Sequence, residues 1–235
     1  MPQAITPNGQ IPANVEAFLF DLDGTLVETS NRWAERLSAS LSGLERLVPR
    51  FDARAVARRV VLGIEMPLNY AVAGAERLGL GDVTRGLGDR VRRSKGLATR
   101  DGGTPIEGVV DLVKDLADRY ALAIVTTRAR REAHALLDTL GVGDVFRVVV
   151  TRQDVWLMKP HPQPVLAAAR DLGVRPSACV MIGDTVTDVR SARRAGAFAV
   201  AVLSGIATHE ELDGAGAQLI LGSAADLRGY LVGRV

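Results

Sequence analysis

Short apolar runs alternate with amphipathic stretches along most of this chain, and this alternation limits the folds open to it. The runs are short enough for strands, and several of the stretches between them have helical periodicity and end at a glycine. The runs are Ala17–Phe20, Ala121–Val125, Val145–Val150, Cys179–Ile182, Ala199–Leu203 and Leu219–Leu221. The stretches are Gly108–Arg119, Arg130–Leu140, Pro164–Leu172 and Asp188–Arg194. Strands that alternate with helices predict an α/β fold, a doubly wound parallel sheet with helices on both faces.

One long interval interrupts the alternation, because residues 28–103 contain no good strand pattern. A crossover between parallel strands needs only about a dozen residues. The interval therefore predicts an inserted α-helical domain, with helices expected at 28–43, 52–61, 67–79 and 82–95. We expect a loose N-terminal tail at 1–14, an α/β core at 15–27 and 104–235, and the helical insertion at 28–103.

The composition argues against several classes of protein. The chain has 235 residues, of which 47% are hydrophobic, and this is enough for a substantial core. The net charge of +2 gives no reason to expect a nucleic-acid partner. The longest apolar stretch, around Ala195–Leu203, is far shorter than the ~20 residues of a membrane span, so no membrane partner is expected. A single cysteine, Cys179, rules out an intramolecular disulfide and reads as a core residue; with no signal-peptide pattern, a cytoplasmic location is favoured.

Two aspartates, Asp21 and Asp23, directly follow the first apolar run. Residues i and i+2 of a strand point to the same side, so the pair places two carboxylates at the end of a buried strand. Burial without partners drives carboxylates toward protonation, and a divalent cation or a chemical role would resolve the conflict. A strand that runs into a turn explains Gly24 but not the carboxylate pair.

Further polar residues follow three later candidate strands: Thr126, Lys159, and the pair Asp184 and Asp188. A parallel sheet gathers the carboxyl ends of its strands at one edge, where such sheets bind ligands. Each residue taken alone has a simpler interpretation. Asp184 could cap the next helix and Asp188 could face its dipole. Thr126 could be an ordinary strand end, and Lys159 a solvated loop residue.

In order and spacing, these residues resemble the four motifs of the haloacid dehalogenase superfamily, and the insertion has the position of its type 1 cap. The segments Phe18–Ser30, Ala123–Arg128, Lys159–Gly173 and Val180–Gly196 are similar to the phosphoglycolate phosphatase and β-phosphoglucomutase branch. The resemblance implies a Mg²⁺-dependent phosphatase that hydrolyses a small phosphomonoester, phosphoglycolate-like or a sugar phosphate, through an aspartyl-phosphate. A phosphomutase of the β-phosphoglucomutase type and a non-catalytic phosphate-binding protein are the alternatives. A monomer and a homodimer are both compatible with the sequence.

The resemblance also implies a role for each residue. Asp21 is implied as the nucleophile and Asp23 as the general acid and base. Thr126 would hydrogen-bond the phosphate, and Lys159 would neutralise the phosphate and the nucleophile. The implied metal ligands are Asp21, Asp23 through its carbonyl, and Asp184, with Asp188 behind them on a metal-bound water or on Lys159. The implied phosphate-binding backbone groups are those of Leu22, Asp23 and Thr127.

Two features leave the substrate open. Many relatives have asparagine after the threonine of the second motif, whereas this chain has Thr127 and Arg128. Arg128 could reach a second anionic group or could be a surface residue, and we favour the surface interpretation. From Glu28 to Arg100 the chain has 14 basic against 8 acidic residues, which favours an anionic leaving group. The arginine candidates for its recognition are Arg32, Arg36, Arg54, Arg58 and Arg59. Phosphoglycolate, a sugar phosphate, a nucleotide and pyrophosphate all fit these observations.

Overall fold

A computed structural model of the chain describes residues 9–28 and 103–231, together with 39–41, 56, 71, 74 and 75. The chain divides into two compact units, residues 1–29 with 100–235, and residues 30–99. The helices and arginines expected within 28–103 lie outside the described residues, apart from those few positions. The fold described below is that of the first unit.

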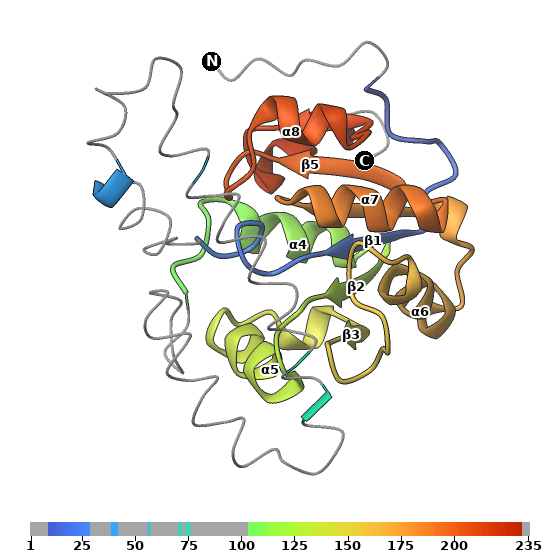
Figure 1. The fold of residues 1–235 in the computed structure, drawn as a ribbon. Coiled ribbons are helices and arrows are strands. Elements are labelled where there is room, and N and C mark those ends of the chain that lie inside the picture. Colours follow the sequence, from blue (N-terminus) through green and yellow to red (C-terminus); the bar gives the residue numbers. More distant parts are fainter. Residues whose placement is uncertain are drawn as a thin grey trace. The chain divides into compact units, whose positions relative to one another are not determined.

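Six parallel strands form a single sheet in the order β3-β2-β1-β4-β5-β6 (Figure 1). They are β1 (Ala17–Phe20), β2 (Ala121–Val125), β3 (Val148–Val150), β4 (Cys179–Gly183), β5 (Phe198–Val202) and β6 (Leu219–Leu221). β1 lies in the middle, where Phe18 is in register with Leu122 of β2 and with Val180 of β4. The strand order reverses between β1 and β4, which is the place where doubly wound sheets bind ligands. The predicted parallel α/β sheet is confirmed.

Helices cover both faces of this sheet. The helices are α4 (Val109–Ala117), α5 (Arg130–Thr139), α6 (Gln163–Leu172), α7 (Val186–Ala195), α8 (His209–Gly214) and α9 (Arg228–Leu231). On one face, Phe18 and Ile182 share a hydrophobic cluster with Leu112 of α4 and Leu137 of α5. α6 and α7 pack on the strands and on each other, outside that cluster. β1 is buried along its whole length, as a strand covered on both faces must be.

The third strand is shorter than its apolar run predicted. Residues Gly143–Val145 form a 3₁₀ turn, and β3 begins only at Val148, where it pairs with Ala123 of β2. Phe146, between the turn and the strand, is buried, and its ring lies edge-on to that of Phe20. The apolar run of 145–150 therefore includes residues that fill the core from a turn, which periodicity does not distinguish from a strand.

Two expectations from composition bear on the described residues. Cys179 is buried in β4, with 1% of its surface exposed, so its interpretation as a core residue is confirmed. Within 9–28, 103–231 and the isolated positions, no helix is both long and apolar enough to cross a bilayer.

Candidate active site

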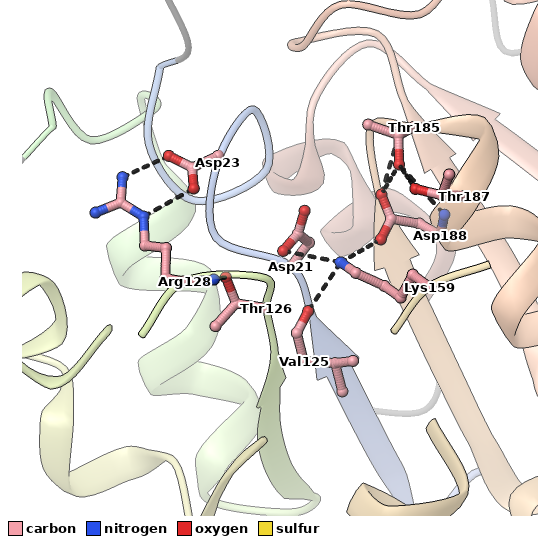
Figure 2. A network of polar contacts seen from close by, with 9 residues as sticks. All are labelled: Asp21, Asp23, Val125, Thr126, Arg128, Lys159, Thr185, Thr187 and Asp188. Carbon is pink, nitrogen blue, oxygen red and sulfur yellow. Dashed lines mark hydrogen bonds and ion pairs between the residues drawn. The ribbon is translucent and has the colours of Figure 1, made fainter. Parts of the chain in front are cut away.

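The ends of β1 and β2 carry Asp21 and Thr126, and Lys159 from the loop before α6 and Asp188 from α7 lie beside Asp21 (Figure 2). The backbone N–H of Asp21 donates to Ile182 O at 2.9 Å, and that of Thr126 donates to Val150 O at 2.9 Å. Both residues thus continue the sheet hydrogen bonding at the ends of β1 and β2, and the rigid sheet fixes their backbones. Asp21, Thr126, Lys159, Asp184 and Asp188 are all buried.

Lys159 stands between two carboxylates. Its Nζ lies 3.0 Å from Asp21 Oδ1 and donates to Asp188 Oδ1 at 2.5 Å and to Val125 O at 3.0 Å. Burial alone would lower the pKa of Lys159, but the Asp188 and Asp21 carboxylates raise it above its usual value. The lysine therefore stays charged inside the protein. Its alternative interpretation as a solvated loop residue is wrong.

Asp188 binds Lys159 and is also part of the capping box at the start of α7. Its Oδ2 accepts hydrogen bonds from the N–H of Thr185 at 3.1 Å and from Thr185 Oγ1 at 2.5 Å. Thr185 Oγ1 in turn accepts from the N–H of Asp188 at 3.2 Å, so Thr185 is the N-cap of the helix. This capping box shows that Asp184 is not the helix cap, and it orients Asp188 toward the lysine.

Three buried carboxylates form a cluster with the donor chemistry of a divalent cation site. Asp21, Asp184 and Asp188 each place one oxygen within 4.8 Å of the others. Asp184 Oδ2 accepts from the N–H of Ile206 at 3.2 Å, whereas Asp184 Oδ1 has no hydrogen-bond partner among the described residues. Three carboxylates against one lysine leave an excess of negative charge. Hard carboxylate oxygens with an unused lone pair fit Mg²⁺.

Burial and the close spacing of the carboxylates also raise the pKa values of Asp21 and Asp184. Burial raises the pKa of Asp21 to about 7, with further contributions from Asp188 and Asp23, although Lys159 acts to lower it. Burial and the charges of Asp188 and Asp21 raise the pKa of Asp184 well above its usual range. Buried carboxylates with raised pKa values either bind protons or are neutralised by a cation. Neutralisation by a cation leaves the oxygens deprotonated and available as ligands.

Two glycines let the backbone approach Asp184. Gly24 has a φ of 77°, and a Cβ built at Gly24 or at Gly205 would overlap the Asp184 carboxylate. Ser204, beside Gly205 in the loop after β5, donates from Oγ to Gly24 O at 2.6 Å. The sequence predicted the turn at Gly24. It offered no motif for Ser204 or Gly205, whose roles depend on how two distant loops meet.

The interpretation of Arg128 as a surface residue is wrong. Only 6% of Arg128 is exposed, and its Nε donates to Asp23 Oδ2 at 2.7 Å. Nη2 of the same guanidinium donates to Asp23 Oδ1. Asp23 therefore faces Arg128 on the β2 side, whereas Asp21 faces Lys159 (Figure 2). Asp21 and Asp23, two residues apart in the sequence, therefore pair with different basic side chains.

The remaining predicted positions lie in the loops around the site. The side chain of Leu22 is buried in the core, and its carbonyl accepts hydrogen bonds from Leu26 N and Val27 N. Thr126 Oγ1 accepts from the N–H of Arg128 at 3.1 Å. Thr127 is partly buried, and its carbonyl accepts from Arg152 Nη1 at 3.4 Å. These contacts fix the loops after β1 and β2.

Comparison with known proteins places this site in a family. Residues 15–196 match the family model described as haloacid dehalogenase-like hydrolase. The chain is 32% identical over 216 residues to "Probable phosphatase IndB" of Dickeya dadantii (strain 3937), covering 90% of this chain and 91% of that protein. It is 28% identical over 221 residues to phosphoglycolate phosphatase of Salmonella choleraesuis (strain SC-B67), with 82% of both chains covered.

Solved structures agree with these relatives. A mutant of CbbY from Rhodobacter sphaeroides, in complex with xylulose-(1,5)bisphosphate, superposes with a TM-score of 0.64 at 26% identity. The match covers 91% of this chain and 96% of that one. The family model spans most of the chain, and the parallel sheet and its buried acidic edge are consistent with it. The chain therefore belongs to the haloacid dehalogenase-like hydrolase family.

Proposed function

We propose that this hydrolase is a Mg²⁺-dependent phosphatase that cleaves a small phosphomonoester through an aspartyl-phosphate on Asp21. The observation that carries the proposal is the position of the Asp21 carboxylate, held at the end of β1 by Lys159 and beside Asp184 and Asp188. The relatives named as phosphatases support the same reaction. A phosphorylated metabolite is therefore proposed as the substrate, phosphoglycolate-like or a sugar phosphate.

Asp21, Asp184 and the carbonyl of Asp23 would hold the metal. Bound Mg²⁺ would offset the repulsion between the Asp21 carboxylate and a dianionic phosphate. The Asp184 oxygen that lacks a hydrogen-bond partner among the described residues supports this assignment. Asp188 would act behind the metal site, where one of its oxygens binds Lys159 and the other binds Thr185.

In the first step, an Asp21 oxygen would attack phosphorus, and the bond from phosphorus to the ester oxygen would break. Asp23 would give a proton to the departing alcohol. Lys159 would stabilise the charge on the phosphoryl oxygens, together with the Thr126 hydroxyl and the backbone N–H groups of Leu22, Asp23 and Thr127. In the second step, Asp23 would take a proton from water, which attacks phosphorus and restores the Asp21 carboxylate.

We also propose that residues 28–103 form a cap that selects the leaving group. The separate compact unit at 30–99 supports this division, as does the arginine excess of that segment. The phosphate chemistry would then reside in the core, and substrate identity in the insertion.

The experiment is a screen of phosphate esters with and without Mg²⁺, using wild-type protein and Asp21→Asn. We expect release of inorganic phosphate that requires Mg²⁺ and falls by about 10³-fold or more in the variant. Isomerisation of a sugar phosphate without phosphate release would identify a phosphomutase instead. Equal activity of the two proteins on every ester would contradict the proposal.

A further inference from the structure

The buried Arg128 pairs with the partly exposed Asp23 on the β2 side of the site. The Arg128 side chain is 7% exposed and that of Asp23 is 26% exposed. The guanidinium meets the carboxylate side-on, with Nε on Oδ2 at 2.7 Å and Nη2 on Oδ1. Two parallel bonds of this kind fix the plane of a carboxylate as well as its position, which a single lysine bond does not do.

The backbone that carries Arg128 is held on both sides. Its N–H donates to Thr126 Oγ1 at 3.1 Å, and its carbonyl accepts from the N–H of Arg152 at 3.4 Å. Thr126 is itself hydrogen-bonded to β3 through Val150. The guanidinium therefore extends from a loop that the sheet keeps in place, and its geometry is set before any ligand arrives.

Among the described residues, both side-chain hydrogen bonds of Arg128 go to Asp23, which favours an action on that carboxylate. The single N–H of Nε is used by Asp23, and Nη2 bonds the second oxygen of the same carboxylate. A carboxylate oxygen can accept more than one hydrogen bond, so the pairing with Arg128 does not by itself prevent proton exchange at Asp23.

We propose that Arg128 is a positioning residue that holds the Asp23 carboxylate where it exchanges protons with the leaving alcohol and the attacking water. This role rests on the proposed phosphatase reaction, in which the same carboxyl group serves both steps. When the ester bond breaks, the proton passes from Asp23 to the alcohol oxygen. When water attacks the aspartyl-phosphate, its proton passes to Asp23, and the electrons of the bond from phosphorus to Asp21 return to the Asp21 carboxylate. Arg128 changes neither its bonds nor its charge.

A double-mutant cycle tests whether Arg128 acts through Asp23. With phosphoglycolate, or the best aliphatic ester of the screen, Arg128→Gln is expected to lower kcat by ~10–100-fold and to change KM by less than ~3-fold. Asp23→Asn alone should lower kcat by ~10²–10⁴-fold. On the Asp23→Asn background, Arg128→Gln should cost no more than a further ~2-fold, because its only route of action is gone.

The two chemical steps separate with p-nitrophenyl phosphate. Its leaving group departs with little help from an acid, so phosphorylation of Asp21 should stay fast in Arg128→Gln while hydrolysis of the aspartyl-phosphate slows. Rapid mixing should then show a burst close to one p-nitrophenolate per enzyme molecule, followed by a slow steady rate. A purely structural defect lowers both phases together.

Arg130→Gln is the matched control. Arg130 lies two residues further along the chain as the first residue of α5, is exposed, and pairs with Asp154 rather than with Asp23. Its kcat should stay within ~2-fold of wild type. Arg128→Lys keeps the charge but cannot bond both oxygens side-on, so kcat should remain reduced. The cycle is repeated with this variant if thermal unfolding shows that Arg128→Gln does not fold.

The outcomes distinguish the two proposals. Wild-type protein that hydrolyses no ester contradicts the proposed function. Active wild type with a normal kcat in both Arg128 variants overturns the positioning role. A raised KM with unchanged kcat also overturns it, since Arg128 would then bind substrate, and so does a loss that multiplies with that of Asp23→Asn.

Discussion

At the scale of single residues, the site depends on how closely Gly24 approaches Asp184. Gly24 has a left-handed φ of 77°, and no space exists for a Cβ beside the Asp184 carboxylate. Gly196 is a natural comparison, because its φ is 78° and a Cβ there would meet nothing within 4 Å. The two glycines thus share a backbone conformation but differ in what a side chain would touch.

Substitution with alanine at these two positions separates backbone strain from collision. Gly196→Ala should cost about 1–2 kcal/mol of stability for the left-handed conformation alone and leave kcat unchanged. Gly24→Ala should cost more and should also weaken Mg²⁺-dependent hydrolysis, because Asp184 must move. Calorimetry and a Mg²⁺ titration of the rate measure the two effects. Equal behaviour of the two variants would show that Gly24 serves only the turn.

The thiol of Cys179 gives a second prediction at this scale. Burial, with a smaller contribution from Glu16, raises the pKa of Cys179 to about 11. The native thiol should therefore resist iodoacetamide at pH 8 and react only on unfolding. Because the unfolded thiol loses its proton at lower pH than the folded one, this group's contribution to stability should decline as pH rises from about 9 to 11. Denaturant unfolding of wild type and Cys179→Ala across that range measures it. A flat difference between the two proteins would contradict this account.

At the scale of elements, α7 links its own capping to the chemistry of the site. The same Asp188 carboxylate that completes the capping box with Thr185 holds Lys159. α8 begins with a similar box formed by Thr208 and Glu211. The acidic residue of the α7 box differs in that it also binds the catalytic-site lysine, Lys159.

Thr185→Ala should therefore affect both stability and rate. Loss of the cap is expected to cost ~1 kcal/mol, and the loosened Asp188 should lower kcat through Lys159. Thr208→Ala should cost a similar amount of stability with kcat within ~2-fold of wild type. Chemical denaturation and steady-state kinetics on the two variants provide the comparison. Unchanged kcat in Thr185→Ala would mean that Lys159 does not depend on the cap.

The strands and helices of the core were more predictable from the sequence than the contacts of single residues. β1 and β2 coincide with their predicted runs, because buried parallel strands are continuous in apolar residues and bounded by polar ones. The start of β3 was not predictable, because the apolar run includes Phe146, which packs in the core but is not part of the strand. Arg128 was missed for a different reason. Its partner, Asp23, lies 105 residues earlier in the chain, and only the fold brings the two together.

At the scale of the whole molecule, burial of several carboxylates lowers the stability of the folded state, and a bound cation would offset this loss. Asp21 lies far from Asp184 and Asp188 in the sequence, so the three carboxylates meet only in the folded state. One lysine does not balance them, and the pKa values of Asp21 and Asp184 are raised. A ligand that binds the folded state alone stabilises it in proportion to the logarithm of its concentration.

Mg²⁺ should therefore raise the melting temperature of the wild-type protein without any substrate. At a concentration of 100 times Kd the expected gain is about 2.7 kcal/mol. Asp184→Asn should respond little to Mg²⁺ and should be at least as stable as wild type without it, because one buried carboxylate is removed. Sodium chloride at matched ionic strength is the control. An equal shift with sodium chloride would assign the effect to general screening.

The central claim is that Asp21 carries the phosphoryl group, and trapping that adduct tests it most directly. Wild-type protein is mixed with p-nitrophenyl phosphate and Mg²⁺, quenched in acid, digested and examined by peptide mass spectrometry. We expect one phosphoryl group on the peptide that contains Asp21, localised to that residue, and none in Asp21→Asn. A hydrolytically active wild type whose phosphoryl group is trapped on another residue, or an Asp21→Asn protein that keeps full activity, would contradict the account.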